Sequence, residues 1–197
     1  LNLTVEEADS LMGRPMGIPK TGIFGLYDLI GIDLMSDVVD TLGTILPNND
    51  DFHKVGASNI PTAELIKKMI NSGFTGNKGK GGFYRSDEKE NEFYLDIYNN
   101  KTVQKSTTVN EKAKVSADLL EKGKETLFHL IKNNSNDLSE KKYTSFSRNV
   151  LGRVLHYASS LIPEITSSPQ DIDDAMKLGF NWIRGPFEII DALGKDI

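Results

Sequence analysis

An internal repeat constrains the fold of this chain more than any other feature of its sequence. Residues 4–33 match residues 168–196 at an offset of 164, which becomes 163 after a gap of one residue. Seven positions are identical: Asp9 and Asp173, Met12 and Met176, Gly22 and Gly185, Phe24 and Phe187, Asp28 and Asp191, Gly31 and Gly194, and Asp33 and Asp196. We interpret the repeat as a duplicated helix–loop–helix unit in which each copy covers the apolar face of the other. The alternative is that capped helices simply resemble one another.

Most of the remaining sequence has the spacing of apolar residues that is typical of helices. Thr4 and Glu7 form a capping-box pattern before a short helix that runs through Met12. Glycines and prolines then predict an irregular loop, followed by a long helix from Leu26 to Ile45 that is kinked near Gly31. Further helices are predicted to begin at Pro61, Pro169 and Pro186. Another is predicted to follow a second capping-box pattern at Thr108 and Glu111, and another to extend over residues 146–161.

The segments between these helices predict a loop, a hairpin and a linker. Residues 76–85 are predicted to form a loop. Four of the seven positions 76–82 are glycine, so the backbone there must bend or approach another group closely. Apolar alternation around Asn99-Asn100 predicts a small β-hairpin, the only strand candidate, and residues 133–142 predict a polar linker. The fold class is therefore mainly all-α with one small β-hairpin. We expect copies of one helical domain at residues 1–90 and 146–197, and the hairpin, helices and linker at residues 91–145.

Composition and charge exclude several classes of protein. The net charge of −5 argues against nucleic acid or an anionic membrane as the main partner. The absence of cysteine excludes disulfides and thiolate sites. No apolar stretch is long enough to cross a bilayer, and the acidic start is unlike a signal peptide, so we expect a soluble protein. The lack of cysteine is compatible with a reducing compartment, and we expect the protein to be cytoplasmic. Because the chain begins at Leu1 and enters a helix almost at once, we expect a fragment of a longer protein.

Motifs of nucleotide-binding and catalytic sites are missing from the sequence. No G-x-G-x-x-G occurs, and Tyr84 stands where the third glycine would be in the stretch 79–84. The histidines, His53, His129 and His156, have no carboxylate at a suggestive spacing. We interpret His156 as a core or boundary residue rather than a base. The sequence therefore predicts no catalytic and no metal-binding residue.

One stretch has the charge to bind an anion. Residues 65–86 contain no acidic residue and five basic ones, Lys67, Lys68, Lys78, Lys80 and Arg85. Glycines beside Lys78 and Lys80 would let backbone amides and ammonium groups reach a phosphate together, whereas the alternative is a solvated loop tip. We expect Phe83 and Tyr84 to pack against the preceding helix.

The repeated loops offer a second, weaker candidate for anion binding. Residues 17–22 and their copy at 181–186 precede helices whose first-turn amides could receive an anion, although the second copy has ordinary helix-start residues. Asp28 and Asp33 recur as Asp191 and Asp196. Recurrence in both copies favours a structural role for these carboxylates over a catalytic one.

Three stretches carry a resemblance to a known family. They are Met12-Gly-Arg-Pro-Met-Gly-Ile-Pro-Lys-Thr-Gly-Ile-Phe-Gly, Gly-Asn-Lys-Gly-Lys-Gly-Gly-Phe-Tyr at residues 76–84, and Gly-Phe-Asn-Trp-Ile-Arg-Gly-Pro-Phe-Glu-Ile-Ile-Asp at residues 179–191. Together they resemble the C-terminal helical region of L-3-hydroxyacyl-CoA dehydrogenases. The closest variety is the bacterial long form with tandem C-terminal domains, which an enoyl-CoA hydratase-like domain often follows.

The resemblance implies part of an NAD-dependent enzyme that oxidises 3-hydroxyacyl-CoA to 3-ketoacyl-CoA in fatty-acid β-oxidation. In that family the Rossmann domain that binds NAD, and the catalytic histidine–glutamate pair, precede the matched region, so we expect the isolated chain to be inactive. The tandem copies are expected to pair with each other as a pseudo-dimer. Residues expected to face the substrate are Lys20, Thr21, Gly22, Lys78, Lys80, Gly82, Phe83 and Tyr84.

Two other functions are left open by the sequence. One is a non-enzymatic helical module that mediates association or binds an anion. The other is a related dehydrogenase that acts on hydroxy acids without CoA, which the Gly-Lys-Gly-Gly-Phe-Tyr loop disfavours. The 3-hydroxyacyl-CoA dehydrogenase interpretation predicts a G-x-G-x-x-G strand–loop–helix upstream in the same reading frame.

Overall fold

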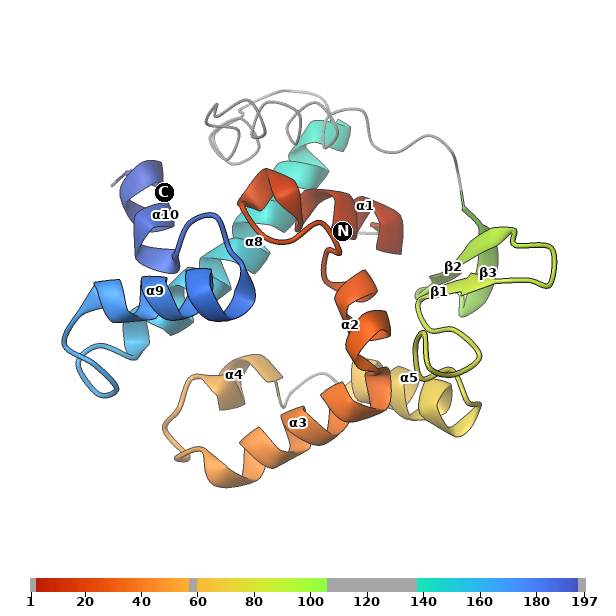
Figure 1. Ribbon diagram of the computed structural model, residues 1–197, viewed down its shortest axis with the longest axis horizontal. Helices are drawn as coiled ribbons and strands as arrows, with labels where there is room; N and C mark the ends of the chain where they lie inside the picture. The colour runs from red at the N-terminus through yellow and green to blue at the C-terminus, as the bar shows by residue number, and fades with distance from the viewer. Residues whose placement is uncertain (1–2, 57–59, 106–137, 195–197) are drawn as a thin grey trace. The chain divides into compact units, whose positions relative to one another are not determined.

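The computed structural model describes residues 3–56, 60–105 and 138–194, most of which are helical (Figure 1). The chain divides into two compact units. Of the described residues, one unit contains 3–9 and 23–105 and is called the sheet unit below. The other contains 10–22 and 138–194 and is called the helical unit. Helix α1, Val5–Leu11, begins in the sheet unit and ends in the helical unit.

The helices of the sheet unit are α2, Phe24–Ile30, α3, Ile32–Ile45, α4, Phe52–Gly56, and α5, Ile60–Asn71. Gly31 separates α2 from α3 with a φ of 112°, a conformation that residues with side chains rarely adopt. The predicted long kinked helix is therefore two helices. Helix α4 was not predicted, whereas α5 begins within one residue of the predicted start.

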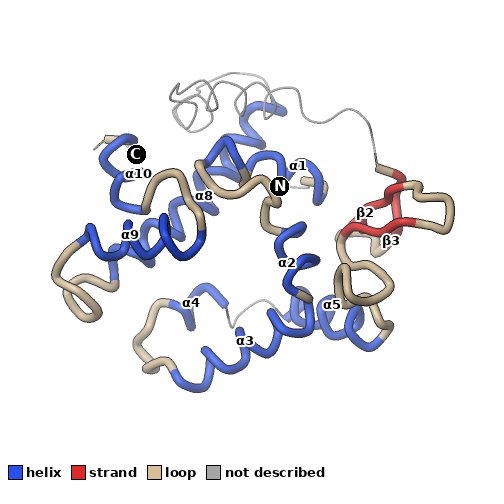
Figure 2. The backbone as a smooth tube through the Cα atoms, viewed as in Figure 1, coloured by secondary structure: helices blue, strands red, loops and turns tan. Residues whose placement is uncertain are grey.

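A three-stranded antiparallel sheet completes this unit (Figure 2). Its strands are β1, Tyr84–Ser86, β2, Glu92–Asp96, and β3, Lys101–Gln104, in the order β1-β2-β3. The predicted hairpin around Asn99-Asn100 is confirmed as β2 and β3, with Asp96 opposite Lys101. The third strand was missed, since the sequence predicted loop as far as residue 85. Pairing of Tyr84 with Tyr94 supplies the backbone partners that make β1 a strand.

One apolar cluster joins the elements of the sheet unit. Its buried members are Val5, Ile32, Met69, Phe83 and Leu95, which come from α1, α3, α5, the segment before β1, and β2. The rings of Phe24 and Tyr27 meet the ring of Phe83 edge-on, with centroids 4.7 and 6.4 Å apart. Burying an apolar side chain of this size contributes about 2 kcal/mol. Phe83 was expected to pack against the preceding helix, α5; it shares the apolar cluster with Met69 of that helix, but its ring contacts are with α2.

The helical unit contains a 3₁₀ turn, Arg14–Met16, and the helices α8, Leu138–Ser160, α9, Pro169–Phe180, and α10, Pro186–Leu193. Helix α10 packs against both α8 and α9. The buried apolar side chains of the unit are Leu11, Met12, Met16, Leu151, Ala158, Ile189 and Leu193. Residues 138–142, predicted as linker, are the first turn of α8. The helix predicted after Thr108 lies outside the described residues.

Candidate functional site

The start of α1 is fixed by the predicted capping box. The Glu7 amide donates to Thr4 Oγ1 at 3.1 Å, and the Thr4 amide donates to Glu7 Oε2 at 2.8 Å. Asp9 follows in the same short helix and is 9% exposed. The orientation of α1 thus determines where the Asp9 carboxylate lies.

The Asp9 carboxylate caps the N-terminus of α2. Its Oδ1 accepts the amides of Ile23 and Phe24, both at 2.7 Å, and its Oδ2 accepts the amide of Gly25 at 2.9 Å. First-turn amides have no partner within their own helix, and a negative charge is favourable at this end of the helix dipole. A residue from one helix therefore satisfies the free end of the next.

The second copy of the repeat has the same cap. Asp173 of α9 accepts the amides of Phe187 at 2.8 Å and Glu188 at 3.0 Å, at the start of α10. In the repeat, Phe187 matches Phe24 and Glu188 matches the position of Gly25. These first-turn amides are occupied by the protein's own carboxylates, which removes the first loop as a candidate for anion binding and agrees with the structural interpretation of the second.

Asp28, near the end of α2, holds the segment that follows α5. Its Oδ1 accepts the Phe83 amide at 2.9 Å, its Oδ2 accepts the Tyr84 amide at 2.7 Å, and its backbone oxygen accepts the Asn77 amide at 2.8 Å. A Cβ at Gly82 would overlap the Asp28 carboxylate, so only glycine permits this approach. The residues 76–84 are called the glycine-lysine loop below, and Asp28 fixes both of its ends.

Tyr84 links the two aspartates of the sheet unit. Its hydroxyl donates to Asp9 Oδ2 at 2.9 Å, while its amide donates to Asp28. Burial raises the pKa of Asp9 and of Asp28 even though their hydrogen bonds act in the opposite direction. Burial and the nearby Asp9 charge also raise the pKa of Tyr84, so the phenol keeps its proton and donates a hydrogen bond to Asp9. Helix α2 is thereby held at both ends by one hydrogen-bond network.

The two lysines of the glycine-lysine loop have different surroundings. Lys78 Nζ lies 2.7 Å from Asp33 Oδ1, and this hydrogen bond lowers the pKa of Asp33. The same ammonium lies over Gly31, where an added Cβ would come within 2.7 Å of it. Lys80 is exposed, and its Nζ lies 3.5 Å from the backbone oxygen of Ser72. Lys78 therefore stabilises the junction of α2 and α3, while the exposed Lys80 side chain lies beside Gly73 at the end of α5.

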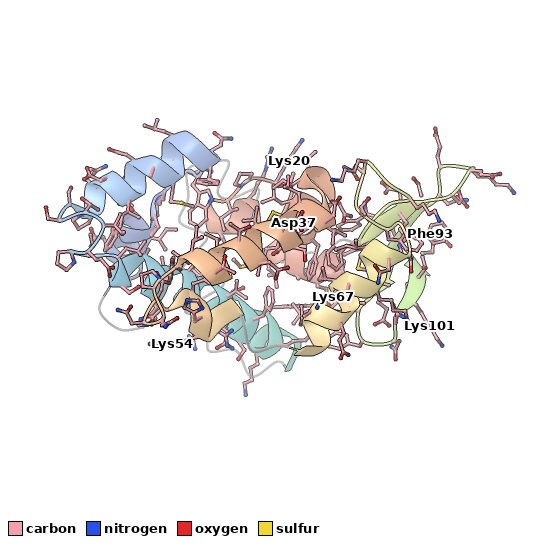
Figure 3. The ribbon with its side chains drawn as sticks, turned by 90° about the horizontal axis from the view of Figure 1, so that it is seen from below. Lys20, Asp37, Lys54, Lys67, Phe93 and Lys101 are labelled. Carbon is pink, nitrogen blue, oxygen red and sulfur yellow. The ribbon has the colours of Figure 1, made fainter. Side chains whose placement is uncertain are left out.

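The other basic residues of the predicted anion-binding stretch also fall into two groups. Arg85 stacks on the ring of Phe74, with its Cζ 3.8 Å from the ring centroid, and donates from Nε to the Gly82 oxygen at 3.0 Å. Lys67 and Lys68 are exposed on α5, where Figure 3 labels Lys67. Arg85 is thus used to stabilise the loop, whereas Lys67 and Lys68 are available to solvent.

The remaining predicted site residues belong to the helical unit. Lys20 is exposed, Thr21 is half-buried and Gly22 is buried (Figure 3 labels Lys20). Nearby, the Gly17 oxygen accepts the amide of Ile183 at 2.8 Å. This bond joins the loop of the first copy to the loop of the second within the helical unit.

Sequence reasoning missed the most informative residues, Asp9 and Asp173. Their identity within the repeat was visible, but their capping role was not. Asp191, the match of Asp28, is exposed on α10, and Asp196 lies outside the described residues. His156 is exposed on α8, so its interpretation as a core or boundary residue was wrong.

The described ranges contain neither a cluster of metal ligands nor a long apolar helix. No three histidine, aspartate or glutamate side chains gather there in a way that could hold a metal ion. None of the helices described there combines the length and apolar character that crossing a membrane requires.

Comparison with known proteins gives one family. The model of the 3-hydroxyacyl-CoA dehydrogenase C-terminal domain matches residues 2–86 and 146–197, which include both copies of the repeat. A putative fatty acid oxidation complex trifunctional enzyme of Rickettsia prowazekii is 33% identical over 195 residues, which are 99% of this chain and 24% of that protein. The protein of the same name from Rickettsia felis is 35% identical over 188 residues, or 95% of this chain and 24% of the relative.

A probable 3-hydroxyacyl-CoA dehydrogenase of Bacillus subtilis is 30% identical over 190 residues, which are 96% of this chain and 22% of that protein. The chain therefore spans about a quarter of the length of the curated relatives named here. No solved structure matches the chain significantly.

Proposed function

The chain belongs to the 3-hydroxyacyl-CoA dehydrogenase C-terminal domain family, and we propose that it supplies the substrate-cleft and pairing region of such an enzyme. The reaction is the NAD-dependent oxidation of 3-hydroxyacyl-CoA to 3-ketoacyl-CoA in fatty-acid β-oxidation. The family match over both copies of the repeat is the observation that carries this proposal. The share of the relatives that the chain covers is consistent with one region of a larger enzyme.

The chemical step is assigned to a different domain of the same polypeptide. Hydride transfer needs a bound nicotinamide, and this chain has no G-x-G-x-x-G fingerprint. A general base needs a free lone pair within reach of the substrate hydroxyl. The buried carboxylates of Asp9 and Asp28 are already engaged by amides of Phe24, Gly25 and Tyr84, so they serve the fold instead. A Rossmann domain would supply NAD binding and the histidine–glutamate pair.

The proposed contacts to substrate come from the two loops singled out by the sequence. CoA carries several phosphate charges, and a lysine ammonium is a mobile point charge suited to them. Lys20 and Lys80 are exposed and fit this role directly. The others, Thr21, Gly22, Lys78, Gly82, Phe83 and Tyr84, shape and hold the loops.

The tandem copies are proposed to pair with each other in place of a partner subunit. The bond between Gly17 and Ile183, which joins the two copies within the helical unit, supports this pairing. Each copy contributes segments to the helical unit, which contains residues 10–22 of the first copy and the described part of the second.

Steady-state kinetics with acetoacetyl-CoA and NADH test the proposal. We expect the full-length polypeptide to oxidise NADH and the isolated chain to be inactive. Lys80→Ala in the full-length enzyme should raise KM for acetoacetyl-CoA, and Lys101→Ala, an exposed lysine on β3, is the matched control. Turnover by the isolated chain would refute the division of chemistry between domains. An inactive full-length polypeptide would instead favour a non-enzymatic helical association module.

A further inference from the structure

The two copies of the repeat differ in how well their second helices are covered. Two apolar positions of α2 match two of α10 at the repeat offset: Leu26 with Ile189, and Ile30 with Leu193. The two α10 side chains are 1% and 2% exposed, whereas their α2 counterparts are 39% and 38% exposed. A face that is buried in the second copy is therefore open in the first.

The open face is a continuous apolar stripe on α2. Its members are Leu26, Leu29 and Ile30, called the α2 face below, and all three side chains are exposed. Residues three and four positions apart lie on the same side of a helix, so these side chains are neighbours. A stripe of this kind normally packs against another element, and its exposure marks a surface that a partner covers.

The second copy shows which elements cover the matching face. Helix α10 packs against both α8 and α9. The match of α9 in the first copy is α1, and the two helices play the same part, since Asp9 caps α2 and Asp173 caps α10. The counterpart of α8 is therefore the element that the described first copy lacks.

The repeat places this counterpart of α8 upstream of the chain. Helix α8 ends at Ser160, eight residues before Ser168, which matches Thr4. A helix that ends eight residues before Thr4 lies wholly upstream of Leu1. The curated relatives leave room for it, because this chain spans only about a quarter of their length.

The upstream polypeptide would also start close to the open face. Val5 of α1 is buried in the apolar cluster against which Phe24 and Tyr27 of α2 pack, and Leu3 is buried as well. A segment that leads into Leu3 therefore begins beside α2. A helix joined to α1 by a short connection can reach the α2 face without crossing the rest of the sheet unit.

We propose that the helix immediately upstream of this chain in the same polypeptide packs on the α2 face, as α8 packs on α10. The repeat unit then consists of three helices instead of two. The upstream helix should contain two apolar residues seven positions apart, like Leu151 and Ala158, the buried apolar side chains of α8. The inference goes beyond the proposed function, because it requires neither substrate nor cofactor.

Cysteine labelling tests the proposal, because the 197-residue chain has no cysteine of its own. Leu29→Cys places a thiol on the α2 face, and Thr102→Cys on the exposed strand β3 is the control. Each variant is made in the 197-residue chain and in a chain extended by about 40 residues of its natural upstream sequence, which are enough for a helix as long as α8. Any upstream cysteine is replaced by serine.

Maleimide should react at least about tenfold more slowly with Leu29→Cys in the extended chain than in the 197-residue chain. Thr102→Cys should react equally in both. Equal reactivity of Leu29→Cys in the two forms would overturn the inference. Protection that grows with concentration in the 197-residue chain would assign the α2 face to a second copy, and protection found only in the full-length polypeptide would assign it to another domain. Either result would exclude the upstream helix.

Matched substitutions in the two copies give a second readout. Leu26→Ser should lower the Tm of the extended chain by about 5 °C and leave that of the 197-residue chain almost unchanged. Ile189→Ser, at the matching buried position, should lower the Tm of both forms by about 10 °C. An equal loss in both forms from Leu26→Ser would contradict the proposal. Neither readout depends on turnover, so an inactive full-length polypeptide would refute the proposed function without affecting this inference.

Discussion

The two copies of the repeat share one use of an aspartate and differ in another. In both copies an aspartate of the first helix caps the second helix, through Phe24 and Gly25 in one copy and Phe187 and Glu188 in the other. In the first copy a later aspartate, Asp28, is buried and bonded to the glycine-lysine loop, whereas its match in the second copy, Asp191, is exposed. The comparison teaches that the cap belongs to the architecture of the helix pair, whereas Asp28 ties the helix pair of the first copy to the glycine-lysine loop.

The largest expected effect comes from removing a cap. Asp9→Ala removes the acceptor of three backbone amides and of the Tyr84 hydroxyl, and should lower the free energy of unfolding by about 3 kcal/mol. Asp173→Ala removes the acceptor of two amides and should cost about 2 kcal/mol. Urea denaturation of the chain measures both, with the exposed Asp37→Ala as control. A loss in only one copy would break the equivalence of the two caps.

The next largest effect concerns the contact between Gly82 and Asp28, which is described for the first copy. Gly82→Ala places a methyl group into the Asp28 carboxylate and should destabilise the chain by about 2 kcal/mol. Gly152→Ala is the control, because a Cβ there meets no atom within 4 Å and the residue lies within helix α8. That change should stabilise the chain by up to about 1 kcal/mol. Similar melting temperatures for both variants would contradict the close approach of Gly82 to Asp28.

A smaller effect tests the link between the two aspartates of the first copy. Tyr84→Phe removes the hydroxyl that donates to Asp9 and keeps the ring, so the free energy of unfolding should fall by about 1.5 kcal/mol. In the background of Asp9→Ala the same change should cost almost nothing, because its partner is gone. Full additivity in this double-mutant cycle would show that the hydroxyl and the carboxylate do not interact.

The smallest effect concerns pH and the second copy. The hydrogen bond from Lys177 lowers the pKa of Glu188 below its ordinary value of 4.5, and Glu188 also accepts the Gly185 amide at 3.0 Å. A depressed carboxylate pKa adds stability above pH 4.5 that is lost as the pH falls through the folded-state pKa.

The stability difference between the unmodified chain and Glu188→Gln should therefore be constant at neutral pH and shrink below pH 4.5. Thermal melts across this range give the measurement. A stability difference that grows on acidification would contradict a lowered pKa of Glu188 in the folded state. The first copy lacks this dependence at the matching position, which is Gly25.

Local patterns in the sequence predicted local structure well. The capping box of Thr4 and Glu7 involves residues three positions apart, and the hairpin around Asn99-Asn100 joins adjacent strands. Prolines at the first helical position likewise placed α5, α9 and α10 within one residue of their observed starts. In each case the signal and the structure that it forms lie within one element or one turn.

Bonds between distant residues could not be predicted in this way. Asp9 and the Phe24 amide are 15 positions apart, and Asp28 and the Phe83 amide are 55 positions apart. The repeat marked both aspartates but did not reveal which amides they accept. Strand β1 was missed for the same reason, because its backbone bonds come from β2 rather than from its own sequence. The glycines of the glycine-lysine loop predicted that its backbone approaches another group closely, but they did not reveal that this group is Asp28.

Amide hydrogen exchange measured by NMR on the whole chain tests the equivalence of the two caps most directly. Amides in the first turn of a helix normally exchange fast, since they have no helical partner, so protection there reports an external acceptor. We predict slow exchange for Phe24, Gly25, Phe187 and Glu188, with Asp9→Ala releasing only the first two and Asp173→Ala only the last two. Exchange of Phe187 and Glu188 at the rate of an unstructured peptide, beside protected Phe24 and Gly25, would contradict the account.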